Sequence, residues 1–187
     1  YWYDYEDMDG NTAVTTVAAD MAAARGIVIV NSMGNEGGGG YVYMIAPADG
    51  DSVVSVGAVD GYGYRAYFSS VGPTYDGRTK PDVMAPGYPV FVATTQDTSD
   101  YGSSSGTSFS CPLTAGVVCL LLQGHPEWTP DDVACALRTT ATQSASPDTL
   151  MGWGIVQAYD AMYSAPLDVP DEDVPAARLV RERPNPS

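Results

Sequence analysis

The chain reads GTSFSCP at residues 106–112 and continues into the largely apolar run LTAGVVCLLL at residues 113–122. This pattern predicts a helix from Ser108 to about Gln123, hydrophobic around most of its circumference and buried centrally in the fold. A hydroxyl at a helix start lies among unpaired backbone N–H groups, at the positive end of the helix dipole. Because both favour the negative charge that develops during acyl transfer, Ser108 is a candidate nucleophile.

The segments upstream predict helix and strand in alternation. Residues 12–25 are alanine-rich with apolar side chains at helical spacing, and Asn11 and Gly26 are placed to cap and to end a helix. The runs at residues 27–30 and 52–59 have the β-branched composition of strands buried on both faces. A helix followed by a strand favours an α/β fold with a mainly parallel sheet between helices.

The segments downstream continue this layering. A third strand is predicted at residues 90–94, after a loop interrupted by prolines. The residues Thr-Pro-Asp-Asp at 129–132 predict a helix start, with a cap, a proline in the first turn and two carboxylates near the positive end of the dipole. A short helix is expected near residues 156–163.

Beyond the last predicted helix the composition changes. From Pro166 onward proline and acidic residues dominate, followed by arginine. We therefore expect one domain over residues 1–165 and an exposed linker or tail over residues 166–187.

The bulk composition excludes several classes of protein. With 187 residues, 44% hydrophobic and 17% charged, the chain can bury a full core. Its formal net charge of −15 argues against nucleic acid or an anionic membrane surface as a partner, and an acidic surface suits a secreted protein. We expect no membrane span. Because the chain begins with Tyr1 and shows no charged leader, it is expected to be a mature product or an internal fragment.

The three cysteines do not predict a disulfide framework. Cys111 and Cys119 lie eight positions apart on one predicted helix, about 12 Å along its axis, which is too far to bridge. At most one disulfide, involving Cys135, is possible, and small buried apolar side chains are the preferred interpretation.

Two glycine-rich segments resemble nucleotide-binding motifs. Residues 61–66, GYGYRA, match GxGxxA, but a dinucleotide site requires a helix to begin there, and the chain continues with turn-forming residues. Gly37 to Gly40 lack the following Lys-Ser or Lys-Thr of a phosphate loop and predict a flexible surface turn. We therefore expect no nucleotide cofactor.

The acidic residues near the start imitate half of a calcium loop. Asp7, Asp9 and Gly10 fit the pattern, but Tyr5 and Thr16 stand where the first and last carboxylates belong, which excludes an EF-hand. A solvated approach to the helix is the simpler interpretation. A structural calcium held by loop carbonyls stays possible, whereas no metal ligands are expected from side chains.

A literal GxSxG occurs at residues 102–106 and offers Ser104 as a nucleophile of the α/β-hydrolase type. That motif must directly follow a strand and needs an acid and then a histidine downstream. Residues 96–101 instead predict a polar loop, and the only histidine, His125, follows 21 residues later. A serine esterase using Ser104 is the weaker alternative.

Ser108 also needs a base, because a serine hydroxyl is a poor nucleophile until its proton is taken. If residues 108–125 are mostly helical, His125 lies about 25 Å from Ser108. His125 is therefore expected to be a surface residue at the end of the helix. The base of an active Ser108 must come from outside these residues.

Several segments together resemble the carboxy-terminal half of a subtilisin-like serine peptidase (subtilase), over about 165 of the 187 residues. They occur in the order and at the spacing of that family: IVIVNSMGNEG at 27–37, VVSVGAV at 53–59, FSSVGP at 68–73, KPDVMAPG at 80–87, and GTS with Pro112 at 106–112. The resemblance implies a three-layer α/β fold, present here as a C-terminal fragment.

The resemblance also implies roles for particular residues. Ser108 would attack the scissile carbonyl, while the Asn35 side-chain amide and the Ser108 backbone N–H would bind the resulting oxyanion. Taken alone, Asn35 would be interpreted as a turn former before glycine-rich sequence. Ser32, Met33 and Gly34 would line one wall of the pocket for the residue before the cleaved bond, with Met33 narrowing it.

The departures from the family limit this hypothesis. The family's triad order is Asp, His, Ser, and its aspartate and histidine motifs lie upstream of where this chain starts. We therefore expect a fragment of a secreted serine endopeptidase that acts on protein or peptide substrates and requires no cofactor. The fragment should be inactive alone and should need the missing N-terminal half of the domain. The alternative is a noncatalytic binding protein that has kept the scaffold.

Overall fold

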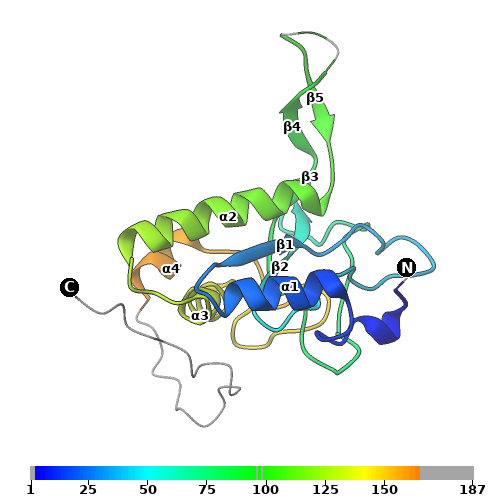
Figure 1. The fold of residues 1–187 in the computed structure, drawn as a ribbon. Helices are drawn as coiled ribbons and strands as arrows, with labels where there is room; N and C mark the ends of the chain where they lie inside the picture. Colours follow the sequence, from blue (N-terminus) through cyan, green and yellow to red (C-terminus); the bar gives the residue numbers. More distant parts are fainter. Residues whose placement is uncertain (1–2, 96, 98, 165–187) are drawn as a thin grey trace.

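The centre of the structure, a computed structural model that describes residues 3–95, 97 and 99–164, is a three-stranded parallel sheet (Figure 1). Its strands are β1 (Ile29–Ser32), β2 (Val53–Asp60) and β3 (Val83–Tyr88), in the spatial order β1-β2-β3. Because parallel strands end at the same edge, the segments that follow β1 and β3 emerge at the same edge of the sheet, on either side of β2. The candidate site lies at this edge.

Helices cover both faces of the sheet. Figure 1 shows α2 along one side and α1 along the other. The helices are the 3₁₀ turn η1 (Tyr5–Asp7) and the α-helices α1 (Val14–Ala23), α2 (Thr107–Gly124), α3 (Pro130–Thr140) and α4 (Ala158–Tyr163). This arrangement confirms the predicted α/β fold, and all four predicted α-helices are present.

The largest core cluster joins the sheet to α2 and α3. Val54 and Val56 of β2 pack with Val118 and Leu121 of α2, and Leu137 of α3 joins the same cluster. These valines belong to an eight-residue strand in which only the last residue retains partial exposure. Burial on both faces is the reason for its continuous run of small and β-branched residues.

Helix α2 is less buried than its sequence predicts. Its buried side chains include Val118 and Leu121, but Leu113 and Leu120 are about half exposed, at 50% and 53%, and Cys119 is also exposed. By length and composition alone, α2 is long and apolar enough to cross a membrane. One such helix is weak support for a span, since the core helix of a soluble domain meets the same criterion.

The third parallel strand occupies a segment that was predicted to be a loop. β3 contains Pro86 and is followed by Pro89, and these prolines were the reason for the loop prediction. One side of β3 pairs with β2, and on the other side Met84 forms a short parallel bridge, donating to the Gly154 carbonyl at 2.8 Å and accepting from the Val156 N–H at 3.1 Å. Pro86 lies two positions beyond this bridge, where its missing N–H breaks no ladder bond.

The strand predicted at residues 90–94 is present, but it belongs to a separate hairpin and not to the parallel sheet. β4 (Val90–Ala93) pairs antiparallel with β5 (Tyr101–Ser104), which includes the end of a predicted polar loop. Figure 1 shows this hairpin projecting away from the rest of the molecule. Phe91 and Tyr101 stack on it with ring centroids 5.8 Å apart and remain largely exposed.

Helix α1 begins two residues later than predicted, and Asn11 is not its cap. The N-cap residue is Ala13, which has no side-chain capping bond. Asp9 instead accepts hydrogen bonds from the backbone N–H groups of Asn11 and Thr12, each at 2.8 Å. The predicted stop is present, because Gly26 has a φ of +88°, which favours glycine.

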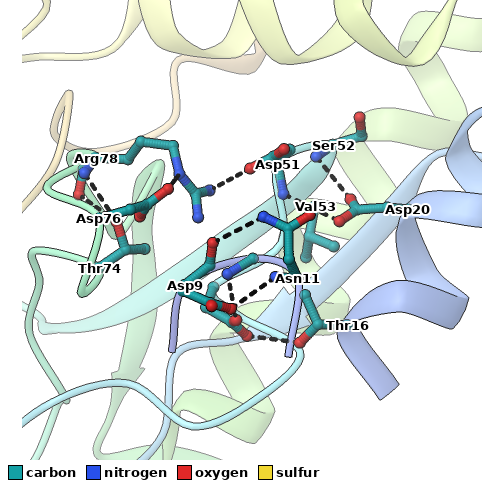
Figure 2. A network of polar contacts seen from close by, with 12 residues as sticks. Asp9, Asn11, Thr16, Asp20, Asp51, Ser52, Val53, Thr74, Asp76 and Arg78 are labelled. Carbon is teal, nitrogen blue, oxygen red and sulfur yellow. Dashed lines mark hydrogen bonds and ion pairs between the residues drawn. The ribbon is translucent and has the colours of Figure 1, made fainter. Parts of the chain in front are cut away.

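A polar network ties α1 to the two loops beneath it (Figure 2). Asp20 of α1 accepts hydrogen bonds from the backbone N–H groups of Ser52 at 2.9 Å and Asp51 at 3.3 Å. Figure 2 shows Arg78 between Asp51 and Asp76, at 2.8 Å and 2.7 Å. Burial raises the pKa of Asp20, whereas hydrogen bonds from Arg78 and Thr74 outweigh burial and lower that of Asp76.

The remaining predictions have mixed outcomes. All three cysteines are free, although the exposed Cys119 contradicts the expectation that they are buried. No helix follows residues 61–66, where Asp60 and Gly63 close a turn, so the dinucleotide motif is not realised. The predicted tail at residues 166–187 lies outside the described residues.

Candidate active site

Ser108 is the second residue of α2 and is exposed at the carboxyl edge of the sheet. It follows the N-cap Gly106 by two positions, so its own backbone N–H is one of the donors that the helix leaves unpaired. The side chain of Ser108 has no hydrogen-bond partner among the described residues. Its hydroxyl is therefore free to meet a ligand.

The turn before Ser108 is held by two glycines. Gly106 has a φ of +153°, which side chains rarely adopt, and its N–H donates to the carbonyl of Gly87 at 3.0 Å. A Cβ on Gly87 would lie 2.4 Å from the Ser110 hydroxyl. The end of β3 thus approaches the start of α2 closely enough to fix where Ser108 stands.

Asn35 lies in the turn after β1 and faces the start of α2. Its Oδ1 accepts hydrogen bonds from the Thr107 backbone N–H at 2.9 Å and from the Thr107 hydroxyl at 3.0 Å. Because a backbone N–H can only donate, the atom facing it must be the amide oxygen. The Asn35 amide nitrogen is therefore turned away from Thr107, with its donors available to a ligand.

Thr107 is a functional residue that the sequence did not reveal. It is fully buried, and besides bonding Asn35 its hydroxyl accepts from the backbone N–H of Gly34 at 3.3 Å. One side chain therefore links the turn after β1 to the helix that carries Ser108. The only signal was a hydroxyl residue next to the candidate nucleophile, which gives no hint of a partner 72 positions upstream.

The three residues expected to line a substrate wall have different environments. Gly34 is buried with a φ of +112°, and a Cβ there would lie 2.8 Å from the Ser70 hydroxyl. Ser32, the last residue of β1, is half-buried. Met33 has 0% exposure and packs with Met8 and Met44, so its side chain does not border an open surface. The expectation that Met33 directly narrows a pocket is therefore not supported by its position.

The two other candidate residues, His125 and Ser104, make structural contacts away from Ser108. His125 caps the far end of α2, where its Nε2 is 2.8 Å from the Met162 carbonyl oxygen and its ring stacks on Trp128. Ser104 is the last residue of β5 and pairs with Val90 in the hairpin. The turn that leads into α2 begins beyond Ser104, so Ser104 is not at the strand-to-helix junction of a nucleophile elbow.

The other nucleophilic group near Ser108 is the half-buried thiol of Cys111. Its Sγ lies 3.4 Å from the Val30 carbonyl oxygen, and burial raises the pKa of the thiol. A raised pKa keeps this thiol protonated and unreactive. Within the described part of the chain, no group of three or more His, Cys, Asp or Glu side chains is arranged to hold a metal ion.

Comparison with known proteins identifies the family. The Subtilase family model matches residues 4–154. The chain belongs to the subtilase family. It is 42% identical over 134 residues to subtilisin NAT of Bacillus subtilis subsp. natto, and 32% identical over 180 residues to the serine protease AprX of Bacillus subtilis (strain 168).

Solved subtilase structures share the fold. The prenylagaramide maturation protease PagA superposes with a TM-score of 0.64 at 26% identity, and the self-cleaved protease domain of PatA with 0.64 at 27%. Both matches cover 82% of this chain and 56% of the solved one.

The chain spans only part of its curated subtilase relatives. The matches cover 71% of this chain but 33% of subtilisin NAT, and 86% of this chain but 40% of AprX. For the subtilisin of Bacillus pumilus, which is 41% identical, the corresponding shares are 73% and 47%.

Proposed function

We propose that the chain is the C-terminal part of a secreted serine endopeptidase domain and carries the nucleophile Ser108 and the oxyanion donor Asn35. The observation that carries this proposal is the fixed orientation of the Asn35 amide next to the start of α2. Two hydrogen bonds from Thr107 hold its oxygen, which leaves the amide donors free beside Ser108.

The proposed reaction is peptide-bond hydrolysis through an acyl-enzyme. The Ser108 Oγ attacks the scissile carbonyl carbon while its proton passes to a base, and the carbonyl oxygen becomes an oxyanion. The Asn35 amide and the Ser108 backbone N–H stabilise this charge. The intermediate then expels the amine, which takes the proton, and water hydrolyses the Ser108 ester. Ser32 and the backbone of Gly34 form one wall for the substrate residue before the cleaved bond.

The base and its orienting carboxylate come, on this proposal, from polypeptide outside these 187 residues. The sole histidine of the chain is fixed at the opposite end of α2, about 25 Å from Ser108. The sheet also has room for more chain, because β1 is paired on one side only. A parallel strand added to this edge would end near Ser32 and Gly34, where a following loop could bring a histidine to Ser108. No cofactor takes part.

A fluorophosphonate probe tests this proposal, because it reacts with a serine only when that serine is activated. We expect no labelling of the 187-residue chain alone, and labelling of a polypeptide that also includes the sequence encoded upstream. Ser108→Ala should abolish labelling of the longer polypeptide, and the matched variant Ser104→Ala should not. Strong labelling of the isolated chain, or labelling at Ser104, would contradict the proposal.

A noncatalytic binding protein built on the subtilase scaffold is the second candidate. It is favoured by one observation, the lack of any histidine in this chain that could reach Ser108. The upstream coding sequence decides between the two, since a binding protein needs neither the aspartate nor the histidine of the triad. An unlabelled longer polypeptide that still binds peptides would support this second function.

A further inference from the structure

Ser70 packs against the turn that carries Asn35 and bonds both neighbours of that residue. Ser70 is fully buried. Its backbone N–H donates to the Gly34 carbonyl at 3.0 Å, and its hydroxyl accepts from the Glu36 backbone N–H at 3.0 Å. The chain is therefore held immediately before and immediately after the proposed oxyanion donor.

The residues around Ser70 extend this attachment. The Gly37 backbone N–H donates to the Phe68 carbonyl at 2.8 Å. A Cβ on Gly37 would lie 2.2 Å from the Ser69 carbonyl oxygen, so the two segments approach as closely as their backbones allow. Residues 68–70 thus form a support to which the Asn35 turn is bonded at three points.

Gly34 makes the serine contact possible. A Cβ at this position would lie 2.8 Å from the Ser70 hydroxyl oxygen, and its φ of +112° is one that side chains rarely adopt. The glycine before Asn35 therefore lets this hydroxyl reach the Glu36 N–H. The Gly34 N–H in turn donates to the Thr107 hydroxyl at 3.3 Å, so the turn is held from the side of α2 as well.

The two buried hydroxyl residues have different tasks at Asn35. Thr107 bonds the amide oxygen and sets the direction that the side chain faces, whereas Ser70 bonds the backbone on either side and sets where the side chain begins. An oxyanion donor must lie about 2.7–3.1 Å from the developing charge, so a shift of the turn weakens stabilisation even if the amide keeps its orientation. A displacement of about 1 Å can cost about a hundredfold in rate.

We propose that Ser70 is a positioning residue for the reaction. It acts through Asn35, by fixing the backbone that carries the oxyanion donor, and has no contact of its own with the reacting atoms. This inference rests on the proposed peptidase function.

Ser69 provides a matched control. It is equally buried, and its hydroxyl also accepts from a backbone N–H at 3.0 Å, that of Ala58 in β2. Ser69→Ala and Ser70→Ala therefore remove the same kind of bond, but only the second removes it from the Asn35 turn. Both are made in the longer polypeptide that includes the upstream sequence, alone and combined with Asn35→Ala.

Steady-state kinetics distinguish positioning from a general loss of stability. Ser70→Ala should lower kcat about threefold to tenfold with KM nearly unchanged, because one bond to the turn is lost and the backbone bonds remain. In the Asn35→Ala background it should lower kcat no further, since the donor that Ser70 places is already gone. Ser69→Ala should change kcat in neither background. The proposal would be overturned by an unchanged kcat in Ser70→Ala, by an equal loss in both backgrounds, or by an equal loss from Ser69→Ala.

Amide hydrogen exchange tests the same bond without activity. In Ser70→Ala the Glu36 N–H should exchange several-fold faster while the amides of β2 keep their protection, and Ser69→Ala should leave exchange at Glu36 unchanged. A polypeptide that lacks peptidase activity would contradict the proposed function, and exchange at Glu36 would still decide whether Ser70 holds the turn. Equal exchange at Glu36 with and without the Ser70 hydroxyl would overturn the proposal.

Ser70→Cys replaces Ser70→Ala if the alanine variant does not fold, because a thiol is a weaker acceptor of similar shape. We expect the same direction of change in kcat and in exchange at Glu36. Failure of both variants to fold, while Ser69→Ala folds, would overturn the proposal, since Ser70 would then be needed by the whole fold.

Discussion

At the scale of single residues, the orientation of the Asn35 amide is the most consequential feature of the site. Its oxygen is bonded by both donors of Thr107, so its nitrogen is turned away from Thr107 and, on the proposed mechanism, toward the substrate carbonyl. No rearrangement is needed when charge develops there, and a donor fixed in advance is worth more than one that must reorient.

Asn35→Ala removes this donor and should lower kcat by about a hundredfold to a thousandfold with little change in KM, because the lost bond forms mainly in the transition state. Steady-state kinetics of the active, longer polypeptide measure both constants. The control is Asn11→Ala, in an exposed loop, which should leave both unchanged. If KM rises by a similar factor while kcat stays unchanged, Asn35 acts in substrate binding instead.

Thr107→Val tests the positioning role of the threonine. The backbone N–H still holds Asn35, but the hydroxyl bond is lost, at a cost of about 1 kcal/mol and thus a several-fold decrease in kcat. Thr107→Ser keeps the hydroxyl and should restore kcat to near its original value. If Thr107→Val and Thr107→Ser behave alike, the hydroxyl does not orient the amide.

The sequence indicated Ser108 and Asn35 but not the residue that joins them. Ser108 and Asn35 lie in recognisable segments, whereas the Thr107 contact depends on a close approach of β1 to α2 that no local pattern records. The burial of Met33, which directly follows β1, was not readable for a similar reason. The core cluster with Met8 and Met44 comes from loops whose path the sequence does not predict.

At the scale of elements, helix α3 shows how fully a local signal can specify a boundary. Thr129 accepts from the backbone N–H of Asp132 at 3.2 Å, and Asp132 accepts from the backbone N–H of Thr129 at 2.7 Å. Both partners of this reciprocal cap lie within four residues of sequence, so the motif is recognisable locally. The predicted helix start is confirmed.

Thr129→Ala should reduce the free energy of unfolding by about 1 kcal/mol, because one backbone donor of the first turn loses its partner. Thr139→Ala is the matched control, since Thr139 is exposed near the other end of the helix and its hydroxyl only bonds the Cys135 carbonyl. Urea unfolding measures both. If both variants lose the same free energy of unfolding, the Thr129 cap does not stabilise the helix more than an ordinary threonine hydroxyl does.

Strand β3 shows the opposite case. Its prolines predicted a loop, and the conflict is removed because Pro86 lies beyond the short bridge that Met84 forms with residues 154–156 on the side away from β2. Sheet order depends on contacts between distant segments and is not readable from one of them.

The carboxylate of Asp82, buried directly before β3 beside Lys80 and Arg138, should make stability sensitive to acid. The pKa of Asp82 is lowered in the folded state, so its contribution is complete above the ordinary carboxyl pKa of about 3.9 and is lost progressively as the pH falls below it. Arg138→Gln removes the largest charge that lowers this pKa, and the loss of stability between about pH 5 and pH 3 should become shallower. Arg25→Gln, a change at an exposed arginine, should leave the slope unchanged, and equal slopes in both variants would refute this account.

At the scale of the whole molecule, apolar side chains remain exposed beside the free edge of β1. They lie on both helices that flank the sheet: Val14, Val17 and Met21 on α1, and Leu113 and Leu120 on α2. Where exposed apolar side chains gather into a patch, they mark a contact with other polypeptide. It is consistent with a domain that is completed by more chain than these residues provide.

The isolated chain should therefore bind a dye for exposed apolar surface and associate with itself. Leu113→Gln combined with Leu120→Gln should reduce both dye fluorescence and the mass measured by light scattering. Tyr159→Gln, at a 75% exposed residue of α4, is the control and should reduce neither. If the isolated chain is monomeric and binds no dye, the exposed apolar side chains of α1 and α2 do not form a contact surface.

The link between Thr107 and Asn35 has a consequence for control of the enzyme in time. If the base arrives on another segment, the oxyanion donor is already in place before any proton can be removed from Ser108. Activity then depends on a single event, the docking of that segment.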